Sequence, residues 1–269
     1  MPQHVLRGRR PRTPIVPRSL AVRAAGTIVA AAAVFATSAA AQASAAAPSP
    51  TAVPCSRSAL VSAIQNANRA GAATLLLARG CDYVLTTAVA EDDGLPPVTG
   101  NITLIGGPGT RISRGPFAGL FRNLEVSSGG ALTLVDLTVA NGRLAGENGF
   151  DDEGGGIRDA GTLVLRHVRL TGNSNRGGFG GGLYVDGGAH ATISDSDLDG
   201  NSATGGSGGA VFSLGDLTVD RSALAGNTAA SGGGIFNLSP GTVTLRFTLV
   251  AFNFPDNCSP QGTIAGCRN

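Results

Sequence analysis

Two short acidic runs are the first candidates for chemistry. Glu91-Asp92-Asp93 and Asp151-Asp152-Glu153 each lie next to glycine, in segments that read as loops. Three adjacent carboxylates can bind calcium or supply an acid/base pair. The competing interpretation, which we favour, is a solvated loop that keeps the surface acidic. The second run is the stronger candidate of the two, because it interrupts a repeating pattern where the repeat length varies most.

The sequence lacks residues that several other common catalytic reactions need. The chain contains no lysine, which excludes Schiff-base chemistry and the phosphate loop of nucleotide hydrolases. His167 and Asp195 occupy equivalent positions on successive repeats and could imitate a catalytic dyad, but no serine or cysteine nucleophile accompanies them. We therefore predict no catalytic residue, no cofactor and no metal.

A column of one arginine and three aromatic residues is the most promising binding feature. Arg158, Tyr184, Phe212 and Phe236 each follow an apolar residue that begins a strand after a glycine cluster. We expect the apolar residues to point inward and this column outward, because the opposite register would bury Arg158. Stacked rings on one face resemble the platforms on which sugar rings or partner proteins settle. The alternative is a self-stacking stripe shielded by glycine-rich loops.

A repeat must position these residues. Glycine clusters and asparagines recur at nearly even spacing, with steps of 24 to 28 residues. The clusters begin at Gly154, Gly180, Gly208 and Gly232, and the asparagines are Asn173, Asn201, Asn227 and Asn253. A fixed period of this size is typical of a solenoid. Between these marks, apolar residues two apart form strand pairs separated by bends. The pattern predicts a parallel β-helix with three short strands in each coil.

The four repeated asparagines have a structural interpretation. Stacked rungs lie about 4.8 Å apart, so an amide at each equivalent bend can pass hydrogen bonds to the next. We therefore expect Asn173, Asn201, Asn227 and Asn253 to form a ladder. Helical repeats are excluded by the 41 glycines, each of which would cost about 1 kcal/mol inside a helix.

The chain divides into a leader, a tether and one domain. Residues 1–43 read as a signal peptide, with six arginines, an alanine-rich apolar stretch and cleavage after Ala43, although Ala45 or Ala47 would serve equally well. Residues 44–54 form a flexible tether. Residues 55–269 form the β-helix domain, in which residues 55–81 supply a helical cap and the first coil. No later stretch is long enough to span a bilayer.

Charge and cysteines point to an oxidising destination outside the cell. Removing the six leader arginines from 20 basic residues leaves 14 against 18 acidic residues, a net charge of −4. Nothing in the mature chain therefore suggests nucleic-acid binding. We favour neighbouring disulfides, Cys55 with Cys81 and Cys258 with Cys267, among three possible connectivities. The second would close a loop over residues 258–267 at the end of the domain.

The repeats resemble those of a known group of proteins. Gly232-Gly233-Gly234-Ile235-Phe236-Asn237 and Leu224-Ala225-Gly226-Asn227 are similar to the polymorphic outer-membrane-protein type of repeat. The domain resembles the secreted right-handed parallel β-helix proteins grouped as pectin-lyase-like. The resemblance implies an all-β, right-handed, single-stranded parallel β-helix solenoid with a short N-terminal capping helix. It implies little about activity.

Enzymes of this fold usually cleave acidic polysaccharides, and their motifs are missing here. The Gly-His-Gly and Arg-Ile-Lys motifs of the hydrolase branch are absent. A calcium-dependent uronate lyase remains as an alternative, using Asp151, Asp152 or Glu153 with an arginine such as Arg158. Our leading hypothesis is a secreted, non-catalytic β-helix that presents a repetitive face to a glycan or a cell-surface protein. A structural envelope component is the third hypothesis.

Overall fold

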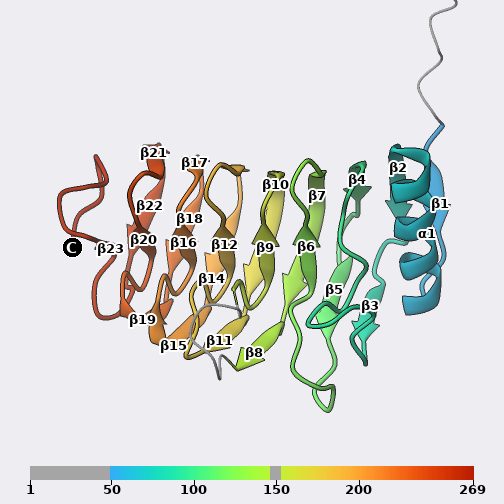
Figure 1. Ribbon diagram of the computed structural model, residues 1–269, viewed down its shortest axis with the longest axis horizontal. Coiled ribbons are helices and arrows are strands. Elements are labelled where there is room, and N and C mark those ends of the chain that lie inside the picture. Colours follow the sequence, from blue (N-terminus) through green and yellow to red (C-terminus); the bar gives the residue numbers. More distant parts are fainter. Residues whose placement is uncertain (1–48, 146–152) are drawn as a thin grey trace, which may run out of the picture. The chain divides into compact units, whose positions relative to one another are not determined.

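The computed structural model describes residues 49–145 and 153–269. The predicted signal peptide, the beginning of the predicted tether, and Asp151 and Asp152 lie outside these residues. The described residues wind into a parallel β-solenoid whose coils follow one another in chain order (Figure 1). The fold class predicted from the repeat is thus confirmed. Equivalent strands of successive coils pair in parallel throughout the three sheets.

The largest of the three sheets has 13 strands. Its main row consists of β1 (Thr51–Val53), β2 (Ala72–Leu77), β4 (Asn101–Ile105), β7 (Ala131–Ala140), β10 (Thr162–Thr171), β13 (His190–Ser194), β17 (Asp216–Asp220) and β21 (Thr242–Arg246). Around a bend the same sheet continues with β3 (Asp82–Leu85), β5 (Arg111–Arg114), β14 (Asp197–Asp199), β18 (Ala223–Ala225) and β22 (Leu249–Ala251). The long strands β7 and β10 pass through this bend without a break, which joins the two rows into one sheet.

Two smaller sheets complete the later coils. The four-stranded sheet contains β8 (Arg143–Ala145), β11 (Ser174–Arg176), β15 (Ser202–Ser207) and β19 (Thr228–Ser231). The six-stranded sheet contains β6 (Leu124–Val126), β9 (Ile157–Asp159), β12 (Leu183–Val185), β16 (Val211–Ser213), β20 (Ile235–Asn237) and β23 (Cys258–Ser259). Strand alternation sends every second side chain into the coil. The inward residues stack into one continuous apolar core.

The helix α1 (Arg57–Ala70) covers the first coil, as the sequence predicts. Its buried face is Leu60, Ile64 and Ala67, at helical spacing. The Ser56 side chain caps the N-terminus by accepting a hydrogen bond from the Ala59 amide, and Gly71 ends the helix in a left-handed conformation. A solenoid leaves the apolar interior of its first coil open at the end of the stack, and this helix covers it.

The predicted tether is wrong at its C-terminal end. Thr51–Val53 form strand β1, which pairs in parallel with β2 and extends the largest sheet by one strand. The Tyr83 hydroxyl fixes this strand by donating a hydrogen bond to the Val53 carbonyl at 2.8 Å. The Cys55–Cys81 disulfide follows directly. The free edge of β2 offers main-chain hydrogen-bonding groups, and even a three-residue segment can pair with them. The composition of residues 44–54 gave no sign of this pairing.

The repeated asparagines form a hydrogen-bonded ladder inside the coils. Asn173 donates to the Asn201 side chain at 3.0 Å, Asn201 to Asn227 at 3.0 Å, and Asn227 to Asn253 at 2.9 Å. Asn123 extends the ladder at one end by donating to Asn173 at 3.2 Å, and Asn257 extends it at the other by accepting from Asn253 at 3.1 Å. Each repeated asparagine also receives or makes main-chain hydrogen bonds, so these buried amides are well satisfied.

The glycine clusters make room for this ladder. Gly180 has a φ of +67°, which favours glycine. At Gly182 a Cβ atom would lie 2.6 Å from the Ala210 carbonyl oxygen and 3.1 Å from the amide carbon of Asn201. The repeat therefore couples glycine and asparagine for one reason: the wall opposite each ladder amide must be bare backbone.

The last coil is covered less completely than the first. The Cys258–Cys267 disulfide closes a loop whose Ile264 is buried against the core. The inward residues Val243, Leu245 and Val250 nevertheless remain only partly buried. The C-terminal edge is thus closed by a loop and not by a helix.

Candidate functional site

The outward-facing column predicted from the sequence runs along the six-stranded sheet. Strand pairing places Glu125 of β6, Arg158 of β9, Tyr184 of β12, Phe212 of β16 and Phe236 of β20 side by side in register. We call these five residues the outer column. Ile157 and its equivalents are fully buried on the opposite side of each strand. The column is charged at its N-terminal end and aromatic at its C-terminal end.

Arg158 is the centre of the charged end. Its guanidinium contacts Glu153 at 3.0 Å, Asp186 at 2.9 Å and Glu125 at 3.7 Å. Burial lowers the pKa of Arg158, but the three carboxylates outweigh it and raise that pKa above its usual value. Arg158 therefore stays protonated, which is the opposite of what a base in a lyase reaction needs.

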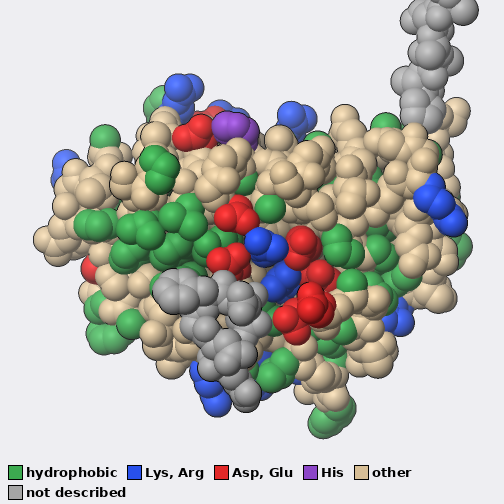
Figure 2. All heavy atoms as spheres, viewed as in Figure 1, with side chains coloured by type: hydrophobic (Ala, Val, Ile, Leu, Met, Phe, Trp, Pro, Cys, Tyr) green, Lys and Arg blue, Asp and Glu red, His purple; other side chains and the backbone are tan. Residues whose placement is uncertain are grey.

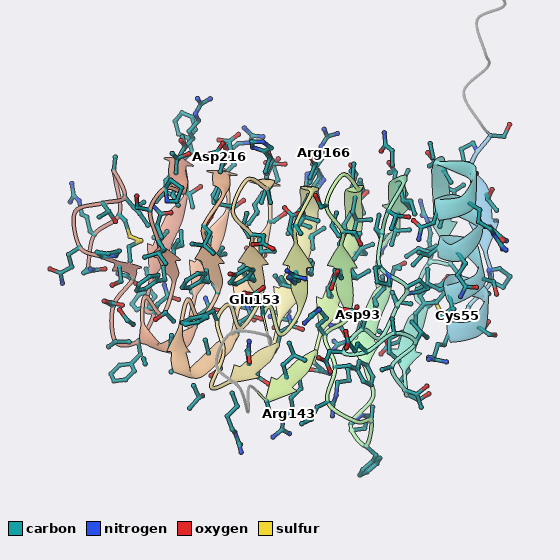
Figure 3. The ribbon with its side chains drawn as sticks, in the orientation of Figure 1. Cys55, Asp93, Arg143, Glu153, Arg166 and Asp216 are labelled. Carbon is teal, nitrogen blue, oxygen red and sulfur yellow. A yellow bond between two sulfur atoms is a disulfide. The ribbon has the colours of Figure 1, made fainter. Side chains whose placement is uncertain are left out.

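A second arginine joins this cluster from the preceding coil. Arg122 contacts Glu125 at 2.8 Å and Asp93 at 3.2 Å. Glu125 thus bridges the two arginines. Figure 2 shows these charges gathered on one face, and Figure 3 marks Asp93 and Glu153 within them. We call the six residues Asp93, Arg122, Glu125, Glu153, Arg158 and Asp186 the charged cluster.

The charged cluster contains one residue from each of the two acidic runs that the sequence singled out. Asp93 comes from the first run and Glu153 from the second. A hollow of about 390 Å³ lies over Asp93, Arg122, Glu125 and Arg158. Burial raises the pKa of Asp93 to about 7, although Arg122 opposes the shift. Burial also raises the pKa of Glu153. The sequence identified the two runs but gave no sign that Asp93 and Glu153 belong to one cluster.

The aromatic end is stacked and covered. Tyr184 and Phe212 lie with ring centroids 5.3 Å apart, and Phe212 and Phe236 5.2 Å apart, with the planes of each pair 1° from parallel. Phe179 packs against Phe212 at 4.7 Å. Tyr184 and Phe212 are each only 3% exposed. The ring faces contact one another, so they do not form an open platform for sugar rings.

An apolar pocket nevertheless opens beside these rings. It has a volume of about 200 Å³ and is lined by Phe179, Tyr184, Ser207, Phe212, Leu214, Phe236 and Leu238. Phe236 is half-buried and Leu238 is 45% exposed. Figure 2 shows an apolar patch directly beside the charged cluster. Burial, together with hydrogen bonding to Glu153, raises the pKa of Tyr184, which ties the aromatic end to the charged end.

Sequence reasoning missed a buried carboxyl group, Asp159, on the inner side of β9, the strand that carries Arg158. Asp159 is fully buried, and its Oδ1 accepts a hydrogen bond from the Gly161 amide at 3.0 Å. Its Oδ2 has no hydrogen-bond partner among the described residues. Burial raises the pKa of Asp159 to about 7. The inward position follows from strand alternation, but an aspartate there gives no motif to search for.

His167 and Asp195, whose positions could imitate a dyad but which we did not predict to be catalytic, do not pair with each other. His167 Nδ1 lies 3.3 Å from Asp136 on the preceding coil, while Asp195 forms a two-pronged contact with Arg221 on the following coil. These residues occupy a bend at which the backbone has positive φ. Charges of opposite sign pair along this exposed bend, which explains them without catalysis.

The described residues lack two features that would indicate other functions. They contain no cluster of three histidine, cysteine or acidic side chains that could hold a metal ion. They also contain no helix long and apolar enough to cross a membrane. The four cysteines form two disulfides, consistent with an extracellular protein.

No protein-family model matches the chain, and no curated protein or solved structure matches it significantly. The site must therefore be interpreted from its own residues.

Proposed function

We propose that this protein is an extracellular, non-catalytic β-solenoid that binds a glycan or a surface partner along the outer column. The observation that carries the proposal is that the apolar pocket adjoins the charged cluster at Tyr184, with the exposed Leu238 and half-buried Phe236 farther along the same pocket. A sugar chain presents apolar C–H groups beside hydroxyl groups, so it needs such a pair of neighbouring surfaces. The exposed parts of Arg158 and Asp186 supply hydrogen-bonding groups next to the apolar edge.

The test must respect the burial of the stacked rings. Truncating Tyr184 or Phe212 would damage packing, so the informative variants are Phe236→Ala and Leu238→Ser at the exposed end. We expect the double variant to lose at least about tenfold in affinity for any glycan or surface preparation that the wild type binds. Phe117→Ala is the matched control, because Phe117 is fully exposed on a distant loop.

Glycan-array binding and pull-down from cell surfaces provide the readout, and thermal melting verifies the fold of each variant. Equal binding by wild type, double variant and control would contradict the proposal. So would a wild type that binds nothing on either assay.

A polysaccharide-acting enzyme is the second candidate. The observation in its favour is Asp93, a carboxyl group with a pKa of about 7 beside Glu125 in a hollow. The protonated Arg158 argues against the arginine-base form of a lyase reaction. Ultraviolet absorbance of unsaturated products from uronate polymers with calcium, and reducing-end release from neutral polymers, would detect turnover. A lack of turnover on both panels would eliminate this candidate.

We further propose that the solenoid belongs with the right-handed, pectin-lyase-like β-helix proteins and is exported through its leader. Support comes from the repeat resemblance, the basic apolar leader and the two disulfides. N-terminal sequencing of protein from culture supernatant should find a start at or near Ser44. Protein that stays in the cell with its leader attached would contradict export.

A further inference from the structure

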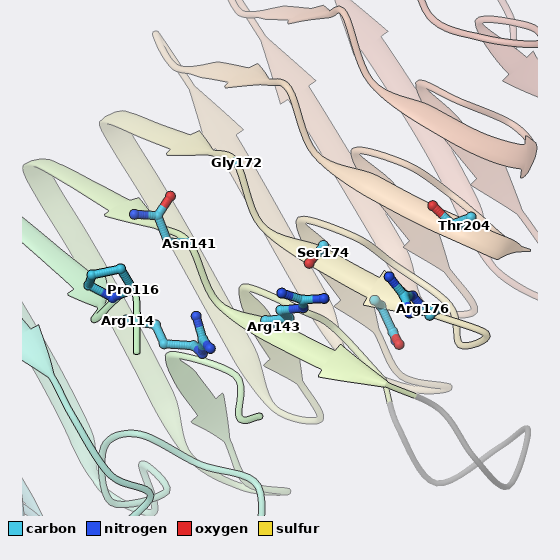
Figure 4. Close-up of a pocket in the computed structure, with 9 residues that line it drawn as sticks. Arg114, Pro116, Asn141, Arg143, Gly172, Ser174, Arg176 and Thr204 are labelled. Atoms are coloured by element: carbon cyan, nitrogen blue, oxygen red, sulfur yellow. The ribbon is translucent and has the colours of Figure 1, made fainter. Parts of the chain in front are cut away.

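A second hollow lies beside the four-stranded sheet and is lined by positive charge. It has a volume of about 360 Å³ (Figure 4). Its lining is Arg114, Pro116, Asn141, Arg143, Gly172, Ser174, Asn175, Arg176 and Thr204. Three of these nine residues are arginines and none is acidic. We call this hollow the arginine pocket.

Arg114 forms the buried wall of the arginine pocket. It is only 7% exposed, and it donates through Nε and Nη2 to the carbonyl oxygens of Gly119 and Ala118. Its guanidinium lies 5.8 Å from the centre of the Phe121 ring. No carboxylate among the described residues is in contact with it. Burial and the nearby Arg143 both lower the pKa of Arg114. Positive charge is thus crowded here, with no carboxylate of residues 49–145 or 153–269 paired to it.

Arg143 and Arg176 reach the same hollow from successive coils. Arg143 of β8 pairs with Ser174, and Arg176 of β11 pairs with Ala145. One rung across and two residues along correspond to roughly 8 Å between their Cα atoms. Both side chains are exposed, and neither forms a salt bridge within the described part of the chain. Figure 4 shows both extending over the four-stranded sheet toward the pocket.

This arrangement differs from that of the paired arginines elsewhere in the described residues. Carboxylate partners lie within 4 Å of Arg111, Arg122, Arg158, Arg169 and Arg221. Three unpaired arginines around one hollow, one of them buried, create a field that attracts anions. Guanidinium groups offer several donors in a fixed fork, which suits oxyanions.

We propose that the arginine pocket binds a tetrahedral oxyanion, a phosphate or sulfate group carried on a larger molecule. Donors approach from Arg114 on one side and from Arg143 and Arg176 on another, Ser174 adds a hydroxyl group near Arg143 and Arg176, and Asn141 adds an amide at the edge of the pocket. An ion with four oxygens spread in three dimensions can accept from all these directions, whereas a carboxylate has two oxygens in one plane. The pocket lies beside the four-stranded sheet and not on the outer column. A failure of anion binding here would therefore leave the proposal for the outer column standing.

The test compares two double variants with equal changes of charge. R143Q/R176Q removes the two exposed pocket arginines and leaves the buried Arg114 in place. R166Q/R246Q is the control, because Arg166 and Arg246 are exposed on the 13-stranded sheet and form no salt bridge within the described residues. Thermal shift and calorimetry would be run with inorganic phosphate, sulfate, acetate and chloride at matched ionic strength.

We expect phosphate or sulfate to raise the melting temperature of the wild type and of R166Q/R246Q more than acetate or chloride does. R143Q/R176Q should bind the preferred ion at least about tenfold more weakly. Retention on immobilised polyphosphate or dextran sulfate then distinguishes a phosphate-bearing from a sulfate-bearing molecule.

Three results would overturn the proposal. The first is no anion effect on the wild type. The second is equal loss in both double variants, which would indicate only general charge attraction. The third is an effect of acetate as large as that of phosphate and sulfate, which would identify a carboxylate site.

Discussion

Arg122 and Arg114 are buried to nearly the same degree but in opposite electrostatic surroundings. Arg122 is 4% exposed and contacts the carboxylates of Asp93 and Glu125. Arg114 is 7% exposed and contacts main-chain carbonyls and the edge of the arginine pocket. A buried ion is costly unless its charge is matched nearby. Arg122 is matched by two carboxylates of the chain, whereas no carboxylate of the described residues matches Arg114.

The difference in surroundings indicates that Arg122 stabilises the fold, whereas Arg114 belongs to a binding site. In the charged cluster each carboxylate lies beside an arginine, so the buried Arg122 pairs hold coils together, and only the partly exposed Arg158 and Asp186 are left to meet a ligand. In the arginine pocket the field is uncompensated among the described residues, so a bound anion would relieve the repulsion between Arg114 and Arg143. If this contrast is right, equivalent substitutions in the two places must have different effects on stability and binding.

The largest expected effect is at Arg122. Replacing it with methionine leaves Asp93 without a cation and Glu125 with only Arg158 at 3.7 Å, and breaking a buried ion pair costs about 3–5 kcal/mol. We expect Arg122→Met to lower the free energy of unfolding by that amount in urea denaturation at pH 7.5. Arg114→Met is the matched control and should cost less than half as much, because it removes hydrogen bonds but also an unmatched charge. Equal losses would erase the distinction between the two arginines.

The next effect concerns a buried acid that no cation matches. Asp159 has a pKa of about 7 in the folded protein, against about 3.9 in an unfolded chain. The folded state therefore binds the proton more tightly, and this group lowers stability as pH rises from about 4 to about 7. Each pKa unit corresponds to about 1.4 kcal/mol. The cost is fully present above pH 7 and is relieved in acid.

Asp159→Asn should therefore stabilise the protein at pH 8 by about 1–3 kcal/mol and have little effect at pH 4. Val185 is the strand partner of Asp159 on the next coil, and Asn237 occupies the same inward position two coils beyond Val185. Asn237 makes a main-chain hydrogen bond there, so an amide fits this column. Denaturation across pH 4–8 measures the change, with the exposed Asp197→Asn as control. A loss of stability at pH 8 would mean that Asp159 has a stabilising role as a carboxylate.

The coil and its ladder could be read from the sequence because each coil repeats the same local rules. Leu165, Ile193 and Val219 stack in the register that the spacing predicts. The asparagine ladder follows the same period. The period did not predict Asn123 as a member of the ladder, because Asn123 precedes a strand of the six-stranded sheet and not the bend that carries the repeated asparagines. Its amide lies next to Gly142.

The charged cluster could be predicted only in part. Arg158 and the aromatic column were placed by register, but Asp93 and Arg122 come from early coils whose loops break the period. Their meeting with Glu153 depends on how those loops fold back, which no spacing records. The covering of Tyr184 and Phe212 was likewise hidden, because Phe179 reaches them from a loop between strands.

The smallest effect is expected at an exposed pair, which shows that pairing alone does not make a charge important. Arg169 contacts Asp199 through two hydrogen bonds of 2.8 Å each, and hydrogen bonding from Arg169 lowers the pKa of Asp199. Arg169 is exposed, so solvent screens the attraction. Arg169→Met should lower the free energy of unfolding by only about 0.2–1 kcal/mol, and by less in 1 M salt.

This contribution also has a pH signature opposite to that of Asp159. Because the pKa of Asp199 is depressed in the folded state, the stabilisation is present above pH 4 and is lost as pH falls through the depressed value. A double-mutant cycle of Arg169→Met with Asp199→Asn at pH 7 and pH 2.5 isolates the pair from its other contacts. A coupling that stays the same at both pH values, or that approaches the loss at Arg122, would show that burial does not set the strength of charge pairs on this solenoid.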